Sequence, residues 1–445
     1  MQYDATDKLN MSTSDLHSPS RRQFIRTSTA AMGAVLAAPA ILTRSSAAVS
    51  PGDTIKVGLV GCGGRGSGAA RNALMGDTDT ILTAVGDVFK NRIDSSLASM
   101  KDDKTMGERV KVEPENCFVG LDAYQKVIDS GVDVVILATP PGFRPVHFKA
   151  AVAAGKHIFC EKPMATDAPG VRSILASVEE AKQKKLAVVA GFCWRYDYPR
   201  REFFKRLHDG QLGEIRAMYH TYLTSPVKPM QSPEARKSDV TDLEWQLRNW
   251  YNFVWLSGDG LVEQAVHSVD KMMWAMKDVP PLRCTAVGGR QVPNYQGNIY
   301  DHIEVNYEFA GGVRAFMAQR QIPNCYGENR DYVMGEKGNG TIGGRRAPVE
   351  MLGEKIYEGP TPDMYEVEHQ ELFASIRKGE PINDGVRMAH STLAGIMGRM
   401  AAYTGKEISW EEALNSQDKL VPDELQWDME LPIAPIAIAG KTKFI

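Results

Sequence analysis

The chain has 445 residues, which is long enough for two domains with substantial buried cores. Hydrophobic residues make up 43% and charged residues 24%, as is usual for a soluble globular protein. The formal net charge of −3 excludes a general electrostatic attraction to nucleic acid. No apolar run is long and clean enough for a permanent membrane span.

The chain opens with a basic segment followed by a short apolar run. Arg21 and Arg22 precede the mildly apolar residues 29–42, and small residues at 46–48 offer a cleavage site. This pattern resembles a twin-arginine export signal. We therefore expect residues 1–48 to be removed, leaving a protein with no membrane span that is periplasmic or secreted. The alternative is a disordered basic tail.

A dinucleotide-binding fingerprint stands at the start of the expected mature chain. Residues 55–60 form a strand-like apolar run, the GxGxxG sequence occupies 61–66, and a helical pattern covers 67–74. Gly61 permits the tight turn, Gly63 lets the backbone approach a pyrophosphate, and Gly66 lets the helix pack closely on the strand. The helix N-terminus offers free amides to the phosphate charge. The alternative is a glycine-rich turn without a ligand.

The second predicted strand, residues 81–86, ends at Asp87. A carboxylate there can accept hydrogen bonds from the adenosine ribose hydroxyls and repels a 2′-phosphate, so the sequence favours NAD over NADP. Lys90 and Arg92 follow closely and soften that preference.

Further apolar runs at 132–138, 157–160 and 186–192 alternate with helix-length segments. This alternation predicts a doubly wound parallel sheet, in which ligands lie at the carboxyl ends of the strands. The candidate cofactor-binding residues lie in the fingerprint, at those strand ends or in the helix after the third run: Gly61, Gly63, Gly64, Arg65, Gly66, Asp87, Thr139, Pro140, His147, Glu161 and Lys162.

The pattern changes after residue 213. Segments 214–223, 282–291, 299–309 and 313–321 look like longer strands, and the last two flank an Ala-Gly-Gly turn that is typical of an antiparallel hairpin. The sequence thus predicts an export signal at 1–48, a Rossmann NAD(P)-binding domain at 51–192 and an α+β domain at 193–445 for substrate binding and oligomerisation.

Glu161-Lys162-Pro163, between a Rossmann half and a second domain, makes the pattern specific. Together with the fingerprint and the segment 260–270, it resembles the family of glucose–fructose oxidoreductase and inositol dehydrogenase, also called Gfo/Idh/MocA. The resemblance spans about 54–415. It implies a second domain with a large open, mostly antiparallel sheet, a sugar or polyol substrate, and a homo-oligomer.

In that family the lysine of the EKP motif and the histidine of a D-x-x-x-H-x-x-D segment face the nicotinamide and the substrate. The resemblance assigns these positions to Lys162 and His267. Glu263 stands where relatives usually carry Asp, which leaves its role open between proton transfer and orientation. Helical spacing predicts that Glu263, His267 and Asp270 share one face. A core histidine and a surface lysine are the alternatives.

The chemistry of alcohol oxidation also requires these residue types, because a base must take the hydroxyl proton while hydride leaves the carbon. His267 titrates in the appropriate range, and Lys162 can stabilise charge on the reacting oxygen. Weaker candidates for the wall of the substrate pocket are Arg195, Tyr196, Arg248, Trp250, Asp270, Tyr365 and His369.

Three functions remain open from the sequence. The leading one is an exported NAD-dependent oxidoreductase that acts on a hydroxyl or keto group of a sugar, glycoside or polyol and holds its cofactor tightly. The second is a glycosidase that uses bound NAD transiently, and the third is a nucleotide-binding sensor without activity. The six cysteines form no CxxC pair, and no cluster has metal-ligand spacing, so free thiols and no metal are expected.

Overall fold

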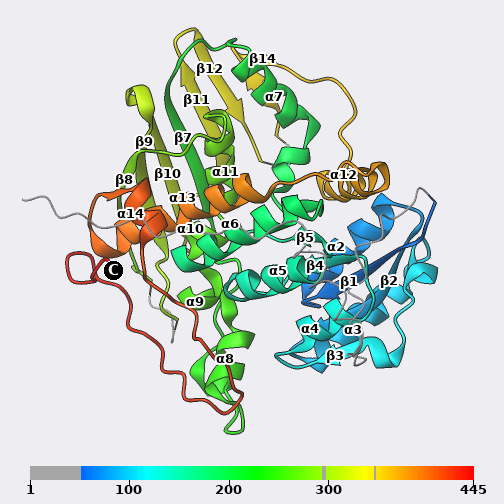
Figure 1. Ribbon diagram of the computed structural model, residues 1–445. Coiled ribbons are helices and arrows are strands. Elements are labelled where there is room, and N and C mark those ends of the chain that lie inside the picture. Colours follow the sequence, from blue (N-terminus) through cyan, green and yellow to red (C-terminus); the bar gives the residue numbers. More distant parts are fainter. Residues whose placement is uncertain (1–51, 293–296, 345–346) are drawn as a thin grey trace, which may run out of the picture. The chain divides into compact units, whose positions relative to one another are not determined.

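The computed structural model describes residues 52–292, 297–344 and 347–445 (Figure 1). The predicted export signal at 1–48 lies outside these residues. Within them, no helix is long and apolar enough to cross a membrane. None of the six cysteines, all of which are described, takes part in a disulfide.

The first sheet has six strands, all parallel, in the order β3-β2-β1-β4-β5-β6. Its central strands are buried on both faces, which explains their nearly continuous apolar sequences. The strands are β1 (Ile55–Val60), β2 (Thr80–Asp87), β3 (Cys117–Val119), β4 (Val134–Leu137), β5 (His157–Cys160) and β6 (Val188–Ala190). The predicted doubly wound sheet is confirmed; only the three-residue, partly exposed β3 was not expected.

Helices flank this sheet, including one from late in the chain. The early helices are α2 (Gly64–Gly76), α3 (Lys90–Lys101), α4 (Ala123–Asp129), α5 (Arg144–Ala153) and α6 (Ala168–Gln183). The late helix α12 (Met364–Lys378) packs against α2, and Arg377 pairs with Asp77 at 2.7 Å. The core around β1 is therefore completed by residues some 300 positions further along the chain.

The second sheet has nine strands in the order β14-β13-β12-β11-β7-β10-β9-β8-β15, and only the β10–β7 pair is parallel. The expected hairpin joins β9 to β10. The strands are β7 (Ile215–Thr224), β8 (Arg283–Gly289), β9 (His302–Glu308), β10 (Arg314–Gln321), β11 (Glu328–Gly335), β12 (Gly338–Ile342), β13 (Val349–Met351), β14 (Glu354–Lys355) and β15 (Ile408–Ser409). The predicted fold class, a parallel sheet followed by a mostly antiparallel one, is confirmed.

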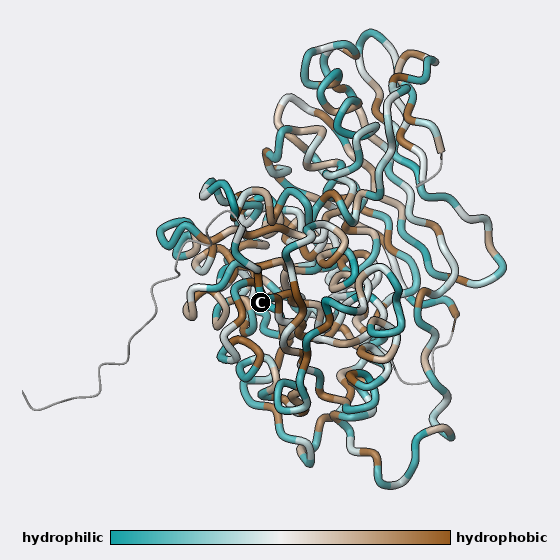
Figure 2. Tube along the Cα trace, turned by 90° about the vertical axis from the view of Figure 1, so that its right-hand side faces the viewer, coloured by the Kyte–Doolittle hydropathy of each residue, from teal (hydrophilic) through white to brown (hydrophobic). Residues whose placement is uncertain are grey.

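Helices α11 (Val266–Ala275) and α13 (Gly385–Thr404) cover one face of the second sheet, and α6 packs on α13 from the side of the first sheet (Figure 1). Hydrophobic segments gather in this interior, whereas the outer loops are hydrophilic (Figure 2). The remaining helices are α7 (Tyr198–His208), α8 (Asp242–Arg248), α9 (Val254–Ser257), α10 (Gly260–Glu263) and α14 (Trp410–Asn415).

The segment around His267 differs from the single helix that its spacing predicts. Helix α10 ends at Glu263 and α11 begins at Val266, so the chain turns between them. Glu263 and His267 still line one pocket, but Asp270 is bound in a buried ion pair with Arg195. The four-residue spacing is the same in a continuous and in an interrupted helix, which is why the sequence did not reveal the break.

The start of β5 makes folding sensitive to acid. The Nδ1 atom of buried His157 accepts a hydrogen bond from the backbone N–H of Ala187 at 2.9 Å, which requires a neutral ring. Burial lowers the pKa of His157 to about 4.

We predict that His157→Asn makes the pH dependence of stability shallower. The native state binds fewer protons at His157 than the unfolded state does, so wild-type stability falls as pH drops from about 6.5 towards 4, by up to about 1.4 kcal/mol per pH unit. The asparagine oxygen accepts the same N–H and does not titrate. Denaturant unfolding at pH 7, 6 and 5 measures the two slopes; equal slopes would show that His157 does not contribute.

Candidate functional site: a nucleotide pocket that opens onto a Lys–Glu–His pocket

The turn after β1 requires glycine at two positions. Gly61 has a φ of 96°, and a Cβ there would lie 2.7 Å from the carbonyl carbon of Ala138. At Gly66 a Cβ would lie 1.8 Å from the carbonyl oxygen of Gly61. Helix α2 can therefore approach β1 this closely only because both positions lack a side chain.

Gly63 and Gly64 face open space instead. No heavy atom lies within 4 Å of a Cβ placed on either residue. Helix α2 has no side-chain cap at Gly63 and no acidic residue in its first turn, so its free N–H groups and dipole face the pocket unopposed. This arrangement suits the pyrophosphate of a dinucleotide, and the residues present fit that group.

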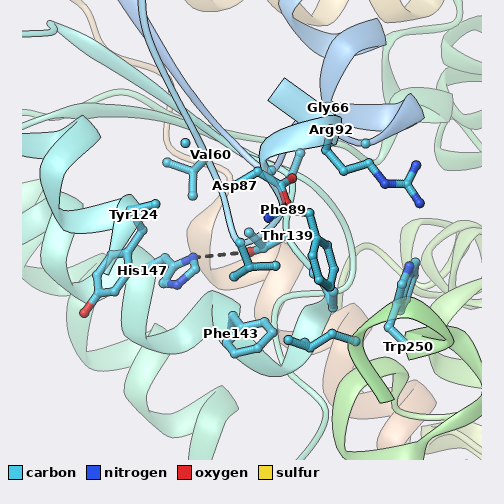
Figure 3. Close-up of a pocket in the computed structure, with 18 of the residues that line it drawn as sticks. Val60, Gly66, Asp87, Phe89, Arg92, Tyr124, Thr139, Phe143, His147 and Trp250 are labelled. Carbon is cyan, nitrogen blue, oxygen red and sulfur yellow. Dashed lines mark hydrogen bonds between the residues drawn. The ribbon is translucent and has the colours of Figure 1, made fainter. Parts of the chain in front are cut away.

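Asp87, at the end of β2, lines the same pocket (Figure 3). Its carboxylate accepts hydrogen bonds from the backbone N–H of Cys62 at 2.7 Å and of Phe89 at 2.9 Å, while burial raises its pKa. Arg92 also lines the pocket, whereas Lys90 is turned to Asp94 at 2.7 Å. Of the two cations near Asp87 in sequence, only Arg92 is therefore placed to modify the preference for NAD.

Aromatic rings form the wall opposite Arg92 in the view of Figure 3. The imidazole of His147 stacks on the ring of Tyr124, with ring centroids 4.1 Å apart. It also stacks on the ring of Phe143, with ring centroids 5.8 Å apart. His147 Nδ1 is 3.2 Å from Thr139 Oγ1. Burial lowers the pKa of His147 to about 3, so this ring is neutral. His147 and Thr139 were expected here; Tyr124 and Phe143 were not.

Residues that lie beyond the first sheet in the chain close this pocket. Lys228, Leu247, Arg248 and Trp250 line it beside the fingerprint. The Arg248 guanidinium lies 4.1 Å from the ring centroid of Phe89, in a cation–π contact. The nucleotide pocket is thus built by residues from both halves of the chain.

A second pocket adjoins the first, and Arg65, Thr139, Lys228 and Trp250 line both. Lys162, which follows β5, points its ammonium group at Glu263, with a 2.9 Å contact to Oε1. The same ammonium also donates to the backbone carbonyl of Glu263. Both side chains are about nine-tenths buried, so this ion pair is shielded from water.

His267 lies in the same pocket as this ion pair. Burial, and then the positive charges of Lys162, Lys271 and Arg65, hold the pKa of His267 well below its usual value. The ring is therefore neutral near neutral pH and able to accept a proton. Its Nδ1 atom is buried without a hydrogen-bond partner in the described part of the chain.

The residues before Lys162 and in the fingerprint are also joined. Arg65 Nε lies 2.8 Å from Glu161 Oε1, and its guanidinium packs 4.8 Å from the ring centroid of Tyr365. A Cβ at Gly191 would lie 2.6 Å from the Glu161 carboxylate, so that glycine leaves the space which Glu161 occupies. The fingerprint turn and the EKP motif thus meet through an ion pair whose carboxylate is buried and whose guanidinium is partly exposed.

Several weaker candidates lie outside the pocket linings. Arg195 pairs with Asp270 at 2.9 Å, and the Tyr196 hydroxyl donates to Asp384 at 2.8 Å. His369 is buried, with its ring stacked on Phe159. Arg248, Trp250 and Tyr365 do line a pocket, as do several residues that the sequence did not single out for the second pocket: Arg144, Trp194, Tyr222, Val227, Lys228, Gln264. Only the adjacency of Gln264 to Glu263 could have signalled one of these.

These features define the class of protein: an NAD-binding oxidoreductase built on a Rossmann fold. Residues 55–192 match the model of the GFO_IDH_MocA family, described as an oxidoreductase family with an NAD-binding Rossmann fold.

Similar proteins support the assignment over most of the chain. An inositol 2-dehydrogenase of Rhizobium meliloti (strain 1021) is 25% identical over 350 residues, covering 75% of this chain and 93% of that protein. An aldose-aldose oxidoreductase from Caulobacter crescentus, solved with glycerol, superposes with a TM-score of 0.63 at 20% identity and covers 80% of this chain and 99% of its own. Scyllo-inositol dehydrogenase from Lactobacillus casei, solved with NAD(H) and scyllo-inositol, gives 0.60 at 18% identity and covers 81% and 100%.

We predict that Gly63→Val weakens NAD binding and leaves folding intact. The added side chain meets open space in the protein but occupies the approach to the α2 amides, so the Kd for NADH should rise at least about tenfold. Fluorescence titration measures the Kd, and thermal unfolding checks the fold. Gly66→Ala is the contrasting control, since its Cβ clashes with Gly61 and should lower the Tm. Unchanged affinity in Gly63→Val would contradict the assignment of this turn.

Proposed function

We propose that this protein is an exported NAD-dependent oxidoreductase that acts on a hydroxyl or keto group of a sugar, glycoside or polyol. One observation carries the proposal: Lys162, Glu263 and neutral His267 line a pocket that shares its wall with the nucleotide pocket. A hydroxyl-bearing carbon in the second pocket would therefore lie next to the cofactor.

The chain's own residues supply the proton chemistry. Bound NAD would supply the hydride acceptor or donor. Neutral His267 can take the proton of the substrate hydroxyl, because its lowered pKa leaves one ring nitrogen unprotonated. The ammonium of Lys162 can donate a hydrogen bond to the same oxygen and stabilise the negative charge that develops there.

The lining of the second pocket supports a carbohydrate or polyol as substrate. Aromatic side chains (Trp194, Trp250, Tyr251) stand beside polar ones (Thr139, Lys228), a combination that suits the apolar faces and hydroxyl edges of a sugar ring. The names of the similar proteins, inositol dehydrogenases and an aldose oxidoreductase, point to the same class of substrate.

The C-terminal segment supports a tightly held cofactor. Leu420 donates from its backbone N–H to Asp167 at the start of α6, at 2.8 Å. Further on, the carbonyl of Leu431 accepts from Gln246 in α8 at 2.8 Å. Between these anchors Trp427 packs against Phe89, with ring centroids 6.2 Å apart. Residues 420–431, which we call the strap, thus hold α8 in place, and α8 carries Arg248 of the nucleotide pocket.

We propose in addition that the cofactor is bound before export through the twin-arginine route. The basic segment with Arg21 and Arg22 supports this route, which carries folded proteins. A nucleotide held in a pocket that the strap keeps closed would stay bound during the transfer. We also propose a homo-oligomer, on the analogy of the family, whose second sheet often presents one face to another subunit.

We predict that Lys162→Ala and His267→Ala bind NADH normally but lower turnover by at least about 100-fold, because each removes a group that contacts the reacting oxygen. Reduction of NAD with myo-inositol, scyllo-inositol or glucose, followed at 340 nm, measures turnover. Lys149→Ala, a change of an exposed lysine on α5, is the matched control. Turnover near the wild-type value in both variants would refute the assignment.

A further inference from the structure

We propose that Glu263 is a positioning residue that holds Lys162, and that the break between α10 and α11, together with Gln264 and Tyr222, builds the socket for this lysine. Glu263 then transfers no proton itself. The proposal deepens the function proposed above and rests on it only for its kinetic test.

The first part of the socket is a backbone carbonyl released by the helix break. In a continuous helix the N–H of His267 would donate to the carbonyl of Glu263, four residues earlier. Here that N–H donates to the carbonyl of Gln264 instead, at 3.3 Å. The carbonyl of Glu263 is left to accept from the ammonium of Lys162. A straight helix at this place would remove one of the lysine's acceptors.

The second part is the carboxylate of Glu263, both of whose oxygens are engaged. Oε1 accepts from Lys162 at 2.9 Å, and Oε2 accepts from the side-chain amide of Gln264 at 2.6 Å. Taking a proton would cost the ion pair with Lys162 in a pocket shielded from water. His267 is neutral and lines the same pocket, so it is the better acceptor for the substrate proton.

The third part is Tyr222 of β7, which fixes the direction of the Gln264 amide. The Tyr222 hydroxyl donates to Gln264 Oε1 at 3.0 Å, so the amide nitrogen must point to Glu263. Burial raises the pKa of Tyr222 well above its usual value, which keeps this hydroxyl a donor. These hydrogen bonds form a chain, which we call the relay, that runs from Tyr222 on the second sheet through Gln264 and Glu263 to Lys162. It positions Lys162 and transfers no proton.

The relay also gives a reason for glutamate at this position. The side chain of glutamate is long enough for one residue to present its carboxylate to Lys162 and Gln264 while its own carbonyl meets the same ammonium. Two further cations, Arg144 and Lys228, act on Glu263 electrostatically, but Lys162 is the one in direct contact.

A double-mutant cycle tests the relay by kinetics. We expect Gln264→Leu and Tyr222→Phe each to lower kcat about 10-fold, the usual effect of losing a hydrogen bond to a charged network. KM and the Kd for NADH should stay within about two-fold, and the double variant should match Gln264→Leu alone, because Tyr222 acts through Gln264. Gln183→Leu and Tyr326→Phe, at exposed positions, are the matched controls.

Two kinetic results would overturn the proposal. Additive effects in the double variant would show that Tyr222 does not act through Gln264. A raised KM with unchanged kcat would show that Gln264 and Tyr222 bind the substrate instead of placing Lys162.

A second measurement needs no substrate, so it separates failure of this proposal from failure of the proposed function. In the ¹H–¹⁵N spectrum of lysine ammonium groups, Lys162 should give a protected signal, assigned by its loss in Lys162→Arg. We expect Glu263→Gln and Gln264→Leu to speed its exchange with water until the signal broadens. If wild type shows no such signal, or the variants leave it unchanged, the socket does not exist, whatever the enzyme oxidises.

Discussion

The contact between Lys162 and Glu263 is the constraint on which the site depends, because it joins two parts of the molecule that the chain builds separately. Lys162 follows β5 of the parallel sheet, and Glu263 ends α10, which packs on α13 beside the second sheet. The partners are 101 residues apart in sequence. A buried ion pair whose partners also have hydrogen bonds tolerates little displacement, since a separated charge would lose its compensation. The pair therefore fixes the nucleotide pocket against the pocket next to it.

Other buried charges hold α11, and with it His267, on the second sheet. Lys271, one helical turn after His267, forms a buried ion pair with Asp331 of β11, whose second oxygen lies 2.8 Å from His220 of β7. Arg195 holds the same helix at the neighbouring residue, Asp270, through contacts with both of its carboxylate oxygens. Each of these charges is compensated, and the charge of Lys271 contributes to keeping His267 neutral. The ion pair that holds α11 on the second sheet thus also helps to lower the pKa of His267.

The sequence predicted what depends on local rules. The fingerprint turn, α2 and Asp87 follow from steric demands within a short stretch, and both sheet types follow from the periodicity of apolar residues. The sequence could not predict what long-range packing decides. The helix break at Gln264 keeps the expected spacing and changes only the backbone bonds. Asp270 shares the periodicity of His267 but turns to Arg195, and α12 returns to cover the first sheet. Lys228 lies in a loop with no motif.

The most direct test of the account is to purify the protein, denature it without added nucleotide and identify what is released. The strap across α8 and the open fingerprint amides predict NAD or NADH in stoichiometric amount. A protein that releases no nucleotide and also binds no NAD from solution would contradict the account, since the pocket next to Lys162 would then have no hydride partner.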